Sequence, residues 1–181
     1  MKKFELTAEF VTNVFGKKLF RIKALVAFGG VEKGELGGFI EKEDNLSHDG
    51  NAWVYGDAQV YGDAQVSGDA WVSGAAQVSG NAQVYGNAQV YGNARVSGNA
   101  QVSGNADYAA VAGFGRYSRT TTFFRCKDKI LRVQCGCFYG DLAQFREIVK
   151  KTHGDSKYAK EYLAIADLME LHFSDECGGE Q

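Results

Sequence analysis

The chain has 181 residues, of which 45% are hydrophobic and 13% aromatic, so it can bury a core and is not a disordered tail. The formal net charge of −2 provides no global field that would attract nucleic acid or an acidic membrane surface. No apolar run approaches the ~20 residues that a bilayer span requires, and acidic residues interrupt any signal-peptide core, so we expect a soluble cytoplasmic protein without a membrane partner.

Residues 1–50 are expected to form an N-terminal β cap. The stretches FELTAEFVTNVF (4–15) and KLFRIKALVAF (18–28) are rich in β-branched and aromatic residues and flank a Gly-Lys-Lys turn, a pattern typical of a β-hairpin. Ile40 and Leu46 lie six residues apart and indicate an irregular first coil before the repeat that follows. A cap is expected because the open end of a strand stack leaves unpaired edges.

Residues 51–106 repeat nearly the same six residues, as in Val-Tyr-Gly-Asp-Ala-Gln. Valine recurs every six residues from Val54 to Val102, with an alanine two residues before it and a glycine two residues after it. This period does not fit a helix, whose apolar positions lie three and four residues apart. In a strand, alanine and valine share one face, and the glycine that follows supplies a corner. Each unit must therefore stack on copies of itself.

The repeat resembles the hexapeptide repeat of left-handed parallel β-helices. In that family three hexads complete one triangular coil, which is a lap of 18 residues in this sequence. The resemblance implies about three coils, and the left-handed winding is implied by the family alone. The expected fold is mainly β: a short left-handed parallel β-helix (51–106) between the hairpin cap (1–50) and a C-terminal ββαα module (107–181). The family also implies a homo-oligomer, a trimer packed on flat faces or a dimer.

The 18-residue lap predicts which outward side chains lie above one another. Three columns are expected: Trp53, Trp71 and Gln89; Gln65, Gln83 and Gln101; Gln59, Gln77 and Arg95. The aromatic residues of the repeat are candidates for a subunit or partner interface: Trp53, Trp71, Tyr55, Tyr61, Tyr85 and Tyr91. Two other interpretations of the tryptophan pair remain open, namely cover by a flanking segment and a stacking platform for a small molecule.

The leader LFRIKAL…GELGGFIE…NLS..GNAWVYGDA is similar to a leader found before hexapeptide repeats in many bacteriophage and prophage proteins. The resemblance spans about residues 19–106. It implies a phage origin, and hence the cytoplasm of a bacterial host, but no activity.

Residues 107–181 change in character. TTTFFRCKDKILRVQCGCF (120–138) indicates two strands around Lys127-Asp128-Lys129. Asp141 is placed to cap a helix over 142–153 that stops at Gly154, and Asp155 or Ser156 would open a second helix. We expect this module to dock on the end of the prism.

Six basic residues lie within 17 positions that hold a single acid, Asp128: Arg116, Arg119, Arg125, Lys127, Lys129 and Arg132. Aromatic residues are interleaved with them, so the stretch could bind a phosphate-bearing ligand or nucleic acid. The alternatives are a solvated strand face and a surface for an acidic protein partner.

Catalytic and metal chemistry find little support in the sequence. Many hexapeptide-repeat proteins are acyltransferases that resemble one another in a histidine base, yet no histidine lies between Ala52 and Ala106. His48 is expected to be a solvated turn residue. A metal site at Cys135 and Cys137 with His153 or His172 lacks the usual zinc spacing, so reduced, packed thiols are expected, with no metal and no cofactor.

These observations favour a non-catalytic, phage-encoded, homo-oligomeric protein that binds and blocks a bacterial host factor, such as a component of a defence system. Three alternatives remain: a sponge for a nucleotide-like small molecule, an acyltransferase without the usual histidine, and a virion or assembly component.

Overall fold

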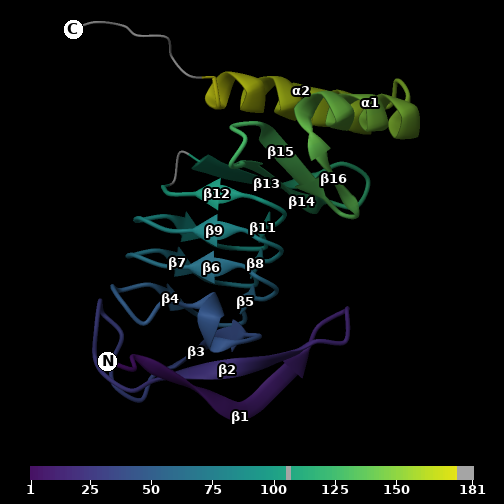
Figure 1. Cartoon of the computed structure of the whole chain (residues 1–181). Coiled ribbons are helices and arrows are strands. Elements are labelled where there is room, and N and C mark those ends of the chain that lie inside the picture. Colours follow the sequence, from purple (N-terminus) through teal and green to yellow (C-terminus); the bar gives the residue numbers. More distant parts are fainter. Residues whose placement is uncertain (105–106, 175–181) are drawn as a thin grey trace, which may run out of the picture.

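A computed structural model of the chain describes residues 1–104 and 107–174. The molecule is a column with three parts: a β-hairpin at one end, a stack of short rungs in the middle, and a sheet with two helices at the other end (Figure 1). It is mainly β, as predicted.

The N-terminal hairpin consists of β1 (Phe4–Thr12) and β2 (Lys18–Ala24). Its turn is closed by the Asn13 side-chain oxygen, which accepts the backbone N–H groups of Phe15 and Lys17, both at 3.0 Å. Strand β3 (Leu36–Ile40) pairs antiparallel with β2 and parallel with β5, the second strand of the repeat. The hairpin therefore continues directly into one wall of the repeat.

The repeat folds into two-residue strands joined by corners. They are β4 (Trp53–Val54), β5 (Gln59–Val60), β6 (Gln65–Val66), β7 (Trp71–Val72), β8 (Gln77–Val78), β9 (Gln83–Val84), β10 (Gln89–Val90), β11 (Arg95–Val96) and β12 (Gln101–Val102). They form three parallel columns, β4-β7-β10, β5-β8-β11 and β6-β9-β12. Trp71 pairs with Trp53 on one side and with Gln89 on the other, so the predicted 18-residue lap is confirmed.

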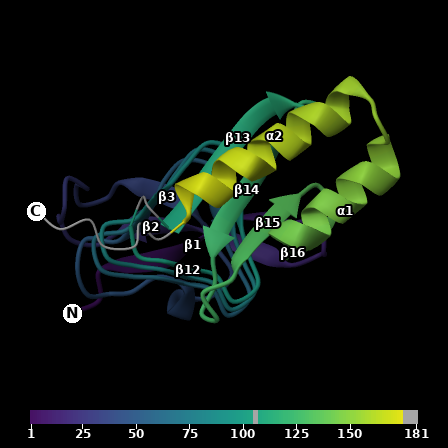
Figure 2. The same cartoon turned by 90° about the horizontal axis from the view of Figure 1, so that it is seen from above.

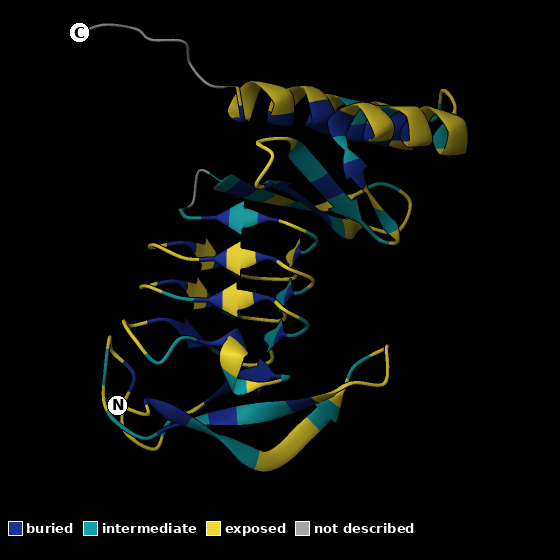
Figure 3. Cartoon of the chain, viewed as in Figure 1, coloured by how far each residue is buried: buried dark blue, intermediate teal, exposed yellow. Residues whose placement is uncertain are grey.

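The valine and alanine of the repeat units are buried within the prism, for example Ala70 and Val72. Figure 3 shows buried segments, in dark blue, along the rungs of the solenoid. The corner glycines adopt positive φ, for example +70° at Gly74. A Cβ on Gly74 would also lie 3.0 Å from the backbone N and O of Gly92 in the next coil, so a larger residue is disfavoured there twice over.

The irregular first coil is present. Ile40 pairs with Val60 and Leu46 bridges to Val66, with the short 3₁₀ helix η1 (Glu43–Asn45) between them. The solenoid therefore has about four turns, one more than the three regular coils predicted. The left-handed winding remains an expectation from the family resemblance.

At the end of the solenoid beside the hairpin, a buried lysine satisfies two backbone carbonyl groups. The Lys3 ammonium donates to the carbonyl oxygens of Ala52 (2.9 Å) and Gly50 (3.3 Å) and lies 4.6 Å from the centre of the Phe28 ring. Burial lowers the pKa of Lys3 to about 8, although the nearby Asp49 acts in the opposite direction.

The C-terminal module is a four-stranded antiparallel sheet with two helices. The strands are β13 (Tyr108–Phe114), β14 (Arg119–Arg125), β15 (Leu131–Cys135) and β16 (Phe138–Asp141), in that order across the sheet. The two predicted strands are β14 and β15, and β13 and β16 extend the sheet on either side. Helices α1 (Leu142–His153) and α2 (Lys157–His172) lie side by side across it (Figure 2). Asp141 caps α1, as predicted, and Ser156 caps α2.

The sheet closes the second end of the solenoid. The backbone N–H of Arg95 donates to the Thr122 hydroxyl at 3.0 Å, and that of Lys127 donates to the Asn99 carbonyl at 3.1 Å. Ala100 bridges to Cys126 in an isolated β-bridge. The module therefore docks on the prism end, as expected, and covers its last coil.

Candidate binding sites

The aromatic side chains of the repeat divide between covered and open positions. Trp53 is 0% exposed because the N-terminal segment covers it: Phe28 and Phe4 lie edge-on to its ring, with centroid distances of 5.4 and 6.2 Å. Of the interpretations of the tryptophan pair, cover by a flanking segment therefore describes Trp53. Its side chain contributes to the core and is not open to a partner.

Trp71, one coil further along, remains open. It is 39% exposed and lies in the middle of the β4-β7-β10 column. The Tyr55 ring packs edge-on against the Trp71 ring, with 5.7 Å between the ring centres. The corner that holds Tyr55 holds Ser73 in the next coil and Tyr91 in the coil after that, and Tyr91 is 61% exposed. We call this surface, made of Trp71, Tyr55, Gln89 and Tyr91, the tryptophan face. It presents aromatic side chains on the hydrogen-bonded rungs of the β4-β7-β10 column.

The other two tyrosine candidates lie elsewhere. Tyr85 is exposed on the corner between the β6-β9-β12 and β4-β7-β10 columns. Tyr61 is half-buried, and its ring lies 6.4 Å from that of Phe15 at the hairpin tip. Only part of the candidate set therefore contributes to one surface.

The six basic candidates also divide, because β14 carries them to opposite ends of the sheet. Arg116 and Arg119 lie at the β13–β14 turn, whereas Arg125, Lys127, Lys129 and Arg132 lie around the β14–β15 turn. At about 3.3 Å per residue, the length of β14 separates the two groups by roughly 20 Å. One ligand of nucleotide size cannot contact both.

At the β14–β15 turn, the fold itself uses two of the four cations. Arg132 pairs with Asp128 at 2.8 Å, and Arg125 donates to the backbone oxygen of Phe173, also at 2.8 Å. Lys127 and Lys129 are exposed. This end therefore fits the interpretation of a solvated strand face.

At the β13–β14 turn, by contrast, both arginines border a hollow of about 220 Å³ under helix α1. Its buried lining residues are Phe145, Val149 and Tyr162, and its exposed ones include Arg116, Tyr117 and Arg119. The guanidinium carbons of Arg119 and Arg116 lie 4.9 and 5.5 Å from the centre of the Tyr117 ring. Across residues 1–104 and 107–174, no carboxylate forms an ion pair with either guanidinium.

A second hollow of about 660 Å³ adjoins the first and shares Tyr117, Arg119 and Cys137 with it. Asn93 and Arg95, from the last coil of the solenoid, line its other side. We call the two together the arginine hollow. Its lining contains three arginines and His153 but no Asp or Glu among the described residues, so the local potential favours an anion.

Tyr162 also lines the arginine hollow. Tyr162 is buried, which raises its pKa to about 12, and its oxygen lies 4.0 Å from the Cys135 sulfur. At neutral pH this hydroxyl keeps its proton and can donate it in a hydrogen bond. Cys135, Cys137 and His153 line the same hollow, yet the described part of the chain holds no group of three or more His, Cys, Asp or Glu placed to bind a metal ion.

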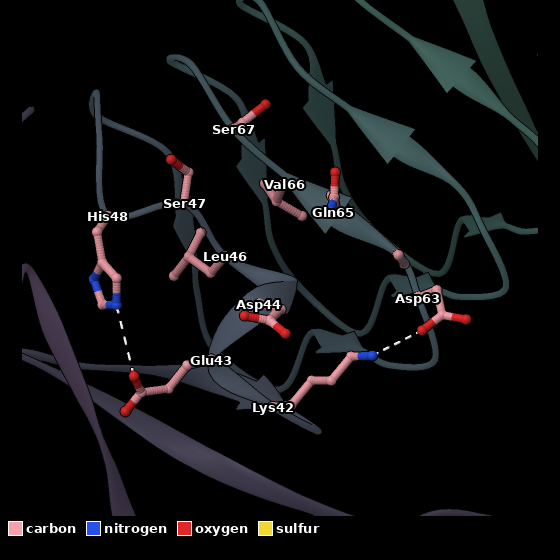
Figure 4. Close-up of a pocket in the computed structure, with 11 residues that line it drawn as sticks. Lys42, Glu43, Asp44, Leu46, Ser47, His48, Asp63, Gln65, Val66 and Ser67 are labelled. Atoms are coloured by element: carbon pink, nitrogen blue, oxygen red, sulfur yellow. Dashed lines mark hydrogen bonds and ion pairs between the residues drawn. The ribbon is translucent and has the colours of Figure 1, made fainter.

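A third cavity, a groove of about 620 Å³, lies beside η1 (Figure 4). Its charges are largely paired: Lys42 contacts Asp63 at 2.7 Å, and His48 faces Glu43 at 3.8 Å. The hydrogen bond from Lys42 lowers the pKa of Asp63. A hydrogen bond from Lys2 lowers the pKa of Glu43. The Nδ1 atom of His48 accepts the Lys3 backbone N–H at 3.2 Å, so a neutral His48 carries its proton on Nε2, toward Glu43.

Sequence reasoning did not find Arg95 or Tyr162 as site residues, and it considered His153 only as a possible metal ligand with Cys135 and Cys137. The sequence marks Arg95 in one way, because an arginine stands there in a column whose other members are Gln59 and Gln77. The other two reach the hollow only because the helices dock over the sheet, and no local pattern marks them.

The stacked rungs define a β-solenoid repeat protein. The YdcK beta solenoid repeat model matches the chain at residues 58–74, 64–80, 76–90 and 88–104. These matches lie within the solenoid and span about a quarter of the chain, so the chain is similar to that family in its repeat. No curated protein matches the chain. No helix of the described residues is long and apolar enough to cross a membrane.

Proposed function

We propose that the protein is a non-catalytic binding protein, encoded by a phage and oligomeric in the cytoplasm of its bacterial host, where it binds and blocks a host factor such as a defence component. The observation that carries the binding function is the tryptophan face. Trp and Tyr supply large contact areas with few rotatable bonds, and they are enriched at the centres of protein interfaces. The phage origin rests on the similarity of the leader alone.

The support of the face is suited to recognition. Successive rungs of the β4-β7-β10 column are hydrogen-bonded, as in the 2.9 Å bond from the Trp71 N–H to the Ala88 carbonyl. An aromatic side chain on such a support loses little backbone freedom when a partner binds. The same argument applies to a second copy of the chain, which is why oligomerisation forms part of the proposal.

The geometry of His48 supports a function without catalysis. Its one unprotonated nitrogen already accepts the Lys3 N–H, so it has no lone pair with which to take a proton from a substrate. An acyltransferase would require a different base.

A pull-down from the bacterial host with tagged full-length protein tests the proposal. Trp71→Ala is expected to lose the captured partner, whereas Gln77→Ala, on a different column, is expected to retain it. Sedimentation of both variants and of the parent protein shows whether a host partner or a second copy of the chain binds the tryptophan face. A loss of oligomer mass in Trp71→Ala assigns the face to a second copy. If Trp71→Ala changed neither mass nor capture, the tryptophan face would have no binding role.

A second candidate function is the sequestration of a phosphate-bearing small molecule. The specific observation in its favour is the arginine hollow, where Arg116 and Arg119, which form no ion pair within residues 1–104 and 107–174, lie beside an apolar cavity.

A further inference from the structure

The arginine hollow has two chemically distinct compartments. The inner one, of about 220 Å³, is lined by buried side chains such as Phe145, Val149 and Tyr162. An apolar cavity of about 150 Å³ accommodates benzene, so this compartment has room for a ring somewhat larger than that. A planar apolar group is the occupant that its size and lining favour.

The outer compartment is more polar: besides two arginines, its lining includes Asn93, Ser118 and Thr120. Arg119 lies on the boundary, since it lines both hollows, and Arg95 reaches the outer one from the solenoid. A guanidinium binds phosphate oxygens through two parallel N–H groups, a geometry that the point charge of lysine does not offer. Glu161, whose charge acts on Tyr162, is already engaged: it accepts the Gly115 N–H at 2.9 Å and lies 3.5 Å from Lys157.

We propose that the arginine hollow binds a small molecule that joins an aromatic ring to a phosphate group, with the ring in the inner compartment and the phosphate at Arg119. Arg116 from the inner compartment and Arg95 from the outer one flank the phosphate, and Tyr162 lines the inner compartment. This assignment deepens the second candidate function and is independent of the tryptophan face. Because Arg95 belongs to the last coil, the site requires both the solenoid and the C-terminal module.

Calorimetric titration of the full-length protein with phenyl phosphate, AMP and inorganic phosphate tests the two compartments. At least one of the two ring-bearing compounds is expected to bind tenfold or more tightly than inorganic phosphate, because the ring adds apolar burial to the charged contact. Binding should weaken as salt is raised. If neither compound bound more tightly than inorganic phosphate, the proposal would be overturned.

Variants locate the site. Arg119→Ala is expected to weaken binding by roughly ten- to a hundredfold, the range for a hydrogen bond to a charged group, and Arg119→Lys should restore part of the loss. Lys127→Ala removes the same charge from the opposite turn of the sheet and is the matched control. Equal losses in Arg119→Ala and Lys127→Ala would show a diffuse charge effect and would overturn the assignment.

A last comparison separates this site from the tryptophan face. Trp71→Ala should bind the ring-bearing phosphate as the parent protein does, and Arg119→Ala should retain the partner captured from the host. Loss of phosphate binding in Trp71→Ala would contradict the placement of the ligand at Arg119.

Discussion

Phe123 and Phe124 are neighbours on β14, yet they belong to different hydrophobic cores. Phe124 packs into the core of the solenoid, together with the stacked valines, whereas Phe123 packs with Phe145 under the helices. Successive residues of a strand face opposite sides, so this one strand joins the two cores.

Replacement of Phe124 is therefore expected to destabilise the end of the solenoid. Phe124→Ala removes a fully buried ring and should lower the free energy of unfolding by about 3–5 kcal/mol, as large-to-small core substitutions do. Urea unfolding measures the change. Phe114→Ala, at an exposed position of β13, is the control and should cost less than about 1 kcal/mol. A small effect of Phe124→Ala would contradict the closure of the prism by the sheet.

The buried Lys3 predicts an unusual pH dependence of stability. Its pKa is about 8 in the folded protein, below its ordinary value of 10.5, so between these two pH values the unfolded chain binds the extra proton. The contribution of Lys3 to stability therefore increases as pH rises from about 8 to 10.5, and the burial penalty is present in full below this window.

The measurement is the difference in unfolding free energy between the parent protein and Lys3→Met across that window. Cys126 and Tyr108, whose pKa values are raised by burial, act in the opposite sense but cancel in the difference. Lys2→Met, at an exposed position, is the control for the loss of a lysine charge. If the difference in unfolding free energy between the parent protein and Lys3→Met did not change with pH across the window, the Lys3 ammonium would be solvated.

The corner glycines allow backbone strain to be separated from steric contact. Gly74 and Gly92 have nearly the same φ, +70° and +68°, but only Gly74 has another coil directly against its Cβ position. Gly92→Ala should cost about 1–2 kcal/mol from the left-handed backbone alone. Gly74→Ala should cost more, and the excess in urea unfolding measures the contact between coils. Equal costs would mean that the coils separate easily.

The two tryptophans should be distinguishable by fluorescence. In Trp71→Phe only the fully buried Trp53 emits, so the emission should be blue-shifted and poorly quenched by acrylamide. In Trp53→Phe the exposed Trp71 should emit at longer wavelength and be quenched readily. Red-shifted, quenchable emission from Trp53 would contradict its cover by the N-terminal segment.

Local chemistry was sufficient to predict the solenoid. The alternation of Ala and Val, with a glycine at each corner, determines both the inward face and the 18-residue register, as the pairing of Trp53 with Trp71 confirms. Asp141 and Gly154 likewise mark the two ends of α1. Strand β13 was missed because YAAVAGF is rich in Ala and Gly, which have low β-propensity, and β16 is short.

The candidate sites were less predictable because they depend on which segments meet. The basic residues are close in sequence, but an extended β14 separates Arg119 from Arg125. Trp53 and Trp71 are equivalent within the repeat, and only the N-terminal segment, which has no repeat, makes one buried and the other exposed. Periodicity describes a column well but does not reveal what lies against its ends.

The separation of the two ends by coils of equal length has a consequence for how this gene can change. The hairpin and Lys3 contact the first turns, while the sheet and Arg95 meet the last, and no hydrogen bond among the described residues joins the coil 69–86 to either end group. Unequal recombination that added or removed a block of 18 codons would move the termini closer or further apart by about 4.8 Å and leave both seams intact. Selection can thus change the length of the solenoid one coil at a time, without changes to the hairpin or to the C-terminal module.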